Sequence, residues 1–149
     1  MQRARRAWAL LQTDSARSIV LAEQALTVAG SDALARAWAG LVLGYNRLNL
    51  ATPAEALATL EPLRSEFERL GDRAGAILLE AGIARAWWRK GRLLEAHRHL
   101  QSLRDEGLRV LRHEQRSVPL RTWCRRCAMR GPVAHRASRW CCTATWPTS

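Results

Sequence analysis

The sequence predicts an all-α fold, an α-solenoid of about three antiparallel helix hairpins over residues 1–116, followed by an irregular tail over residues 117–149. Apolar residues recur at helical spacing in six successive segments, and cap and turn residues separate these segments. One hairpin pattern also returns after about forty positions. A helix–turn–helix unit that repeats at such a period is typical of an α-solenoid.

The first hairpin is predicted from residues 2–12 and 15–29. Each segment carries its apolar residues on one side. Asp14 offers the side-chain oxygen that a helix start needs for its unpaired N–H groups. Gly30 is expected to end the second segment, and Asp32 is expected to cap the next one.

The second hairpin, residues 33–49 and 53–70, carries the strongest local signals. Thr52 and Glu55 have the spacing of a capping box, in which two side chains satisfy backbone N–H groups at a helix start. The proline between them suits the first position of a helix. A tight turn between the two helices follows from these three residues.

Two further features of this hairpin concern its packing and its straightness. Gly44 and Ala56 are small, so the two helix backbones can approach closely at these positions. Pro62 lies inside the second segment, where it removes one N–H and clashes with a preceding carbonyl. A kink is therefore predicted near residues 58–61.

The third hairpin is predicted from residues 73–90 and from Leu93 onward. Gly71 and Asp72 end one helix and cap the next, and Gly91 supplies the turn inside the hairpin. The small and large positions of the second hairpin match the third at these pairs: Gly44 and Ala84, Ala56 and Ala96, Leu60 and Leu100, Leu63 and Leu103.

This small–large pattern resembles the tetratricopeptide repeat family over about residues 4–111. The residues that carry the resemblance are Leu43, Gly44 and Ala56 in one unit, and Ile83, Ala84, Trp87, Gly91 and Ala96 in the next. The resemblance implies a solenoid in which the first helices of successive units line a concave face that binds a peptide.

The positions that contact ligands in the tetratricopeptide family correspond to ten residues of this chain. They are Trp38, Leu41, Tyr45, Leu48, Asn49, Leu78, Ala81, Arg85, Trp88 and Arg89. The resemblance implies a polar groove with two guanidinium groups, Arg85 and Arg89, which suits a carboxylate or an acidic peptide. In the alternative interpretation, Trp88 packs on the next helix and the two arginines are solvated.

Residues 7–26 and 43–100 also resemble the helical repeat region that precedes the output domain of bacterial signalling enzymes. The resemblance is strongest to enzymes with a GGDEF diguanylate cyclase domain, and LuxR-type regulators are another setting for such a region. The resemblance implies a sensory or scaffolding fragment of a larger regulator. Within these 149 residues we find no cyclase motif, no phosphate-binding glycine loop and no catalytic constellation. We therefore expect a non-catalytic protein-interaction module with no cofactor and no metal.

Charge and hydropathy set further expectations. Residues 1–114 hold 17 lysines and arginines against 13 acidic residues, whereas the last 35 residues hold seven arginines and no acid. The net charge of +11 therefore belongs mainly to the tail, and we do not expect the repeats to bind nucleic acid.

No apolar run approaches the ~18 residues of a membrane helix, and no secretion signal is evident. A cytoplasmic protein is expected.

The tail contains every cysteine of the chain. One hypothesis is a zinc site made from Cys124, Cys127, His135 and Cys141, and another is nucleic-acid binding through arginine and tryptophan. We favour a third interpretation, an out-of-frame or truncated segment that is disordered, because acids and helical periodicity both vanish there. The last repeat would then be uncapped and prone to self-association.

Deletion of residues 120–149 should leave the helical signal per folded residue unchanged and the melting temperature no lower. A segment without periodic apolar residues has little with which to offset an ordering entropy of ~1–2 kcal/mol per residue. Circular dichroism of both chains provides the measurement. A stoichiometric zinc ion that is lost, together with stability, on mutation of Cys124 and Cys127 would contradict this prediction.

Overall fold

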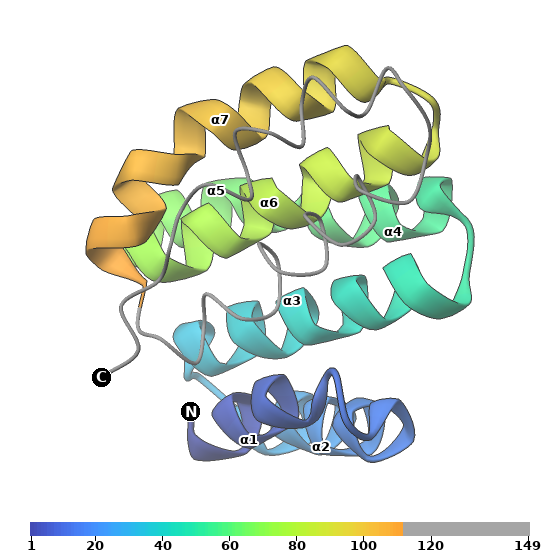
Figure 1. Ribbon diagram of the computed structural model, residues 1–149. Coiled ribbons are helices and arrows are strands. Elements are labelled where there is room, and N and C mark those ends of the chain that lie inside the picture. The colour runs from blue at the N-terminus through green and yellow to red at the C-terminus, as the bar shows by residue number, and fades with distance from the viewer. Residues whose placement is uncertain (112–149) are drawn as a thin grey trace, which may run out of the picture.

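The structure is a computed structural model, and it describes residues 1–111 (Figure 1). Within this part of the chain there are seven α-helices and no strand, so the all-α prediction is confirmed. The helices are α1 (Gln2–Leu10), α2 (Ser15–Val28), α3 (Ala33–Leu50), α4 (Pro53–Leu60), α5 (Leu63–Leu70), α6 (Arg73–Arg89) and α7 (Leu93–Val110). The predictions for residues 117–149 lie outside the described residues.

Neighbouring helices pack as hairpins: α1 with α2, α3 with α4 and α5, and α6 with α7. Each hairpin also contacts the next, because α1 packs on α3 and α3 packs on α6 (Figure 1). The second helices take part as well, since α2 lies against α3 while α4 and α5 lie against α6. Helix α3 is therefore in the middle of the molecule, with neighbours on several sides.

The predicted helix starts are confirmed by their hydrogen bonds. Asp14, Asp32 and Asp72 accept from the backbone N–H groups of Arg17, Ala35 and Gly75, at 2.9, 2.9 and 3.0 Å. Thr52 and Glu55 form both bonds of a capping box. Arg92, which replaces Thr52 after the forty-residue shift, makes no capping bond, as expected. Turn glycines at positions 30, 71 and 91 adopt positive φ, the region that glycine enters without strain.

At the predicted kink near Pro62 the helix is interrupted, although Glu61 and Pro62 keep helical dihedral angles. Helix α4 ends at Leu60 and α5 begins at Leu63, whereas the sequence suggested one bent helix over residues 53–70. Pro62 has no N–H to donate to the carbonyl of Ala58, and its ring clashes with that turn. Two residues, Glu61 and Pro62, therefore separate the two helices.

Aromatic rings connect three helices in the core. Trp8 of α1 lies edge-to-face against Trp38 and Tyr45 of α3, with ring centroids 5.8 and 5.1 Å apart. Trp38 makes a similar contact with Phe67 of α5 at 6.3 Å. Such pairs contribute roughly 0.5–1.5 kcal/mol each beyond the area they bury. This cluster joins the first hairpin to the second.

Glycine permits the close approach of α3 and α4, as the sequence predicts. A Cβ atom at Gly44 would lie 2.3 Å from Cδ2 and 2.7 Å from Cγ of Leu60, and Leu60 is fully buried. Ala56 is also fully buried. Larger residues at either position would have to push the two helices apart.

We predict that Gly44→Ala lowers the free energy of unfolding by about 1–3 kcal/mol, because the new methyl group overpacks a closed contact. Gly107→Ala is the matched control. Its Cβ would meet Ile77 only at 3.6 Å, an ordinary contact, so this variant should gain roughly 0.5–1 kcal/mol from helix propensity. Urea denaturation of the two variants provides the measurement. Equal effects of the two substitutions would show that α3 and α4 do not approach as described.

Candidate functional site

Several residues of the predicted groove lie in the core. Trp38, Leu41, Tyr45 and Leu48 are each at most 4% exposed. The Tyr45 hydroxyl donates to the carbonyl of Leu78 at 2.7 Å, and burial raises the pKa of this phenol well above its ordinary value. These side chains hold α3 against its neighbours. Peptide binding stays a prediction, and the structure restricts it to the other residues of the predicted set.

Leu78 and Ala81 of α6 are buried as well, and the remaining groove residues lie at the C-terminal ends of α3 and α6. We call Asn49, Arg85, Trp88 and Arg89 the arginine face. Asn49 and Arg89 are exposed, Trp88 is half-buried, and Arg85 is 8% exposed. Arg85 Nη2 donates to Asn49 Oδ1 at 2.7 Å, so the structure brings these two predicted residues into direct contact.

Arg89 is positioned by the end of helix α3. Its Nη1 donates to the backbone carbonyls of Leu48 and Ala51, the latter at 3.2 Å. Helix C-termini present unpaired carbonyls and a partial negative charge, and a guanidinium satisfies both. Neither arginine is simply solvated, as the alternative interpretation held, because each is bonded to α3. Arg85 and Arg89 thus join the second and third hairpins.

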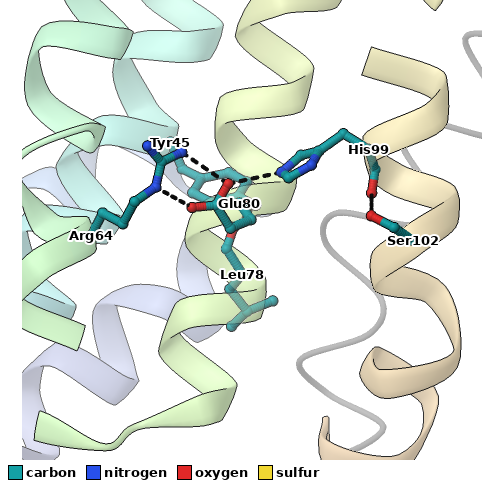
Figure 2. A network of polar contacts seen from close by, with 6 residues as sticks. All are labelled: Tyr45, Arg64, Leu78, Glu80, His99 and Ser102. Atoms are coloured by element: carbon teal, nitrogen blue, oxygen red, sulfur yellow. Dashed lines mark hydrogen bonds and ion pairs between the residues drawn. The ribbon is translucent and has the colours of Figure 1, made fainter. Parts of the chain in front are cut away.

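A second polar cluster was not predicted from the sequence (Figure 2). Glu80 of α6 accepts two hydrogen bonds from Arg64 of α5, Nε to Oε1 at 2.6 Å and Nη2 to Oε2 at 3.0 Å. His99 Nε2 of α7 lies 2.8 Å from the same Oε2. No local pattern could have revealed this cluster, because its members are 16 and 19 positions apart in the sequence.

The environment of Glu80 favours its ionised form. Partial burial of the carboxylate acts to raise its pKa, but the hydrogen bonds from Arg64 and His99 outweigh burial, so the pKa is lowered from 4.5. The same contact raises the pKa of Arg64. The carboxylate side chain is 18% exposed, so solvent screens the cluster only in part.

His99 is also packed against an aromatic ring. Its imidazole lies 5.3 Å from the ring of Trp87, measured between centroids. The guanidinium of Arg92 lies over Trp87 at 4.7 Å and also binds the carboxylate of Glu95. His99 is therefore held from two sides, by a carboxylate of α6 and by an indole of the same helix.

The described part of the chain offers no group of three or more histidine, cysteine, aspartate or glutamate side chains that could hold a metal ion. The hypothetical zinc ligands Cys124, Cys127, His135 and Cys141 lie outside residues 1–111. Among the described helices, none has the length and apolar character needed to cross a membrane.

Comparison with known proteins finds no matching family model, no matching curated protein and no matching solved structure. The structure by itself establishes the class: an all-α protein of packed helix hairpins, compatible with a helical repeat fold.

We predict that Glu80→Gln removes part of the acid sensitivity of the fold. A carboxylate whose pKa is depressed in the folded state stabilises the protein above its unfolded pKa, near 4.5, and this contribution is lost as the pH falls below it. Thermal melts at pH 7 and pH 3.5 should show a smaller difference for the variant than for the wild type. An unchanged difference would mean that Glu80 is not bonded to Arg64 and His99 in solution.

Proposed function

We propose that this chain is a non-catalytic protein-interaction module, a tetratricopeptide-like scaffold or sensory region of a bacterial signalling protein. Its ligand would be an acidic peptide or a free C-terminal carboxylate, bound at the arginine face. The observation that carries the proposal is the placement of two guanidinium groups, one helical turn apart on α6, against the end of α3.

The fixed position of the Arg89 side chain supports the binding of a ligand at the arginine face. Arg89 is exposed, and its bonds to the described residues use Nη1 alone. Its Nε and Nη2 can therefore meet a ligand without breaking the contacts to α3. Because those contacts already restrict the side chain, a carboxylate that binds it has less rotamer entropy to overcome.

An apolar neighbour supports a peptide rather than a small anion. Leu50 is 67% exposed and directly precedes Ala51, whose carbonyl accepts from Arg89. A peptide whose carboxylate meets Arg89 can cover this leucine with an adjacent apolar side chain. Burial of such a side chain is worth about 25 cal/mol per Å² of apolar surface.

The wider setting of the proposal comes from the sequence resemblance to repeat regions that precede bacterial output domains. A module of this kind would work in the cytoplasm, and its partner would be a protein or peptide. Self-association through the last hairpin is a second mode of assembly that the same proposal allows.

We predict that the chain binds an acidic peptide with a free C-terminus more tightly than its amidated or basic counterpart. Arg89→Glu should weaken acidic-peptide binding about tenfold or more, because a charge-assisted hydrogen bond is worth roughly 1.5–3 kcal/mol. Fluorescence anisotropy with labelled peptides gives the affinities, and thermal melts establish that the variant is folded.

Arg5→Glu is the matched control, because it reverses the same charge at an exposed site on α1. It should change the affinity less than twofold. If Arg89→Glu and Arg5→Glu have equal effects, the interaction is general attraction to a basic protein. If no peptide class is preferred, the arginine face is a structural clamp between hairpins and the proposed function is wrong.

A further inference from the structure

Helix α7 is attached to α6 by a small apolar cluster together with polar contacts. Its cluster with α6 consists of Ala81, Ala84, Ala96 and Leu100, with Trp87 and Trp88 packed against it. The main core, by contrast, contains the aromatic and leucine side chains of α1, α3, α4 and α6. Because the alanines of this cluster bury little apolar surface, the polar contacts between α6 and α7 add to the docking of α7 beside the two tryptophans.

The contact between His99 and Glu80 is the polar link at the centre of this attachment (Figure 2). Glu80 is held in place by Arg64 of α5, so its carboxylate is fixed whether or not α7 is docked. His99 is 27% exposed, which leaves it accessible to protons from solvent. A second link at the other end of α7, between Arg73 and Glu106, contains no group that titrates near neutral pH.

The charge of the imidazole decides the strength of this link. A neutral histidine makes an ordinary hydrogen bond to the carboxylate, whereas an imidazolium makes a charge-assisted bond about twice as strong. Imidazoles change charge between pH 5 and 8, a range in which a carboxylate with a lowered pKa stays ionised. Protonation therefore strengthens the contact over that whole range.

Other charged groups near His99 do not reverse the strengthening of this contact by protonation. Arg64 of α5 lies on the far side of the Glu80 carboxylate and is neutralised by it. On α7, Arg92 lies across the Trp87 ring and is paired with Glu95. The charge in direct contact with the imidazole is the carboxylate at 2.8 Å.

We propose that His99 is a proton-sensitive latch that docks α7 onto α6. When His99 is protonated, the ion pair with Glu80 holds α7 closed. When it is neutral, α7 opens more often and exposes the Ala81 and Ala84 side of α6. A mildly acidic solution thus tightens the last hairpin, while acidification below the pKa of Glu80 loosens it again.

Hydrogen exchange of the whole chain tests the latch. Protection of α7 amides is measured relative to α3 amides in the same molecule at pH 8 and pH 5.5, after correction for intrinsic exchange rates. The ratio should rise about fivefold at pH 5.5 in the wild type, the effect of roughly 1 kcal/mol expected for a partly exposed charged hydrogen bond.

His99→Gln keeps a hydrogen-bond donor but cannot change charge, so the fivefold rise should disappear. Arg98→Gln, at an exposed site of the same helix, is the control for a change of surface charge and should retain the rise. A rise that persists in His99→Gln, or that is lost in Arg98→Gln, overturns the proposal.

The wild type alone provides an independent test if a variant does not fold. The rise in relative protection should shrink in 1 M NaCl, because salt screens a partly exposed ion pair. A rise that is insensitive to salt, or no rise at all, overturns the latch.

Discussion

The carboxylate of Asp72 joins two requirements of the fold in one side chain. Its Oδ1 accepts from the backbone N–H of Gly75 and so starts helix α6, while its Oδ2 accepts from the indole N–H of Trp38 at 2.7 Å. The beginning of the third hairpin is thereby fixed to α3, the first helix of the second hairpin. Trp38 in turn contacts the rings of Trp8 and Phe67. Loss of Asp72 would therefore affect a helix start, a contact between hairpins and the orientation of the aromatic cluster.

Polar bonds between hairpins recur along the length of α3 and α6. Trp38 bonds to Asp72, Tyr45 to Leu78, and Asn49 to Arg85. Three positions along α3 are thus matched to the N-cap of α6 and to two positions along it. Apolar packing has no direction, whereas hydrogen bonds fix the register of one helix on the next. Large side chains that a peptide-binding repeat would offer to a ligand here hold the hairpins together. Arg89, which is exposed near the end of this series, is the residue at which we propose that a ligand binds.

Stability is distributed unevenly over the three hairpins. Helix α3 is surrounded by neighbours and carries tryptophan, tyrosine and leucine side chains. The separate cluster between α6 and α7 is smaller, with three alanines, Leu100 and the partly buried Trp87 and Trp88. An element held in this way opens at a lower free energy than the core does. The arginine face and the His99 contact both involve α6, so the ligand and the proton that we propose for them would act on the same helix.

Local chemistry in the sequence determined the helices and their ends. A capping aspartate or threonine and a turn glycine act within three or four residues of the backbone groups they serve, so Asp14, Thr52 and Gly91 could be assigned from spacing alone. Only the tertiary structure decided that Tyr45 is buried, that Arg89 binds the end of α3, and that Glu80 joins Arg64 to His99. These contacts depend on how far α3 and α6 approach and on how each helix is rotated about its axis. Small residues such as Gly82, where a Cβ atom would lie 3.0 Å from the Tyr45 ring, set that geometry by excluded volume. Excluded volume is a property of both partners at once and cannot be read from either segment.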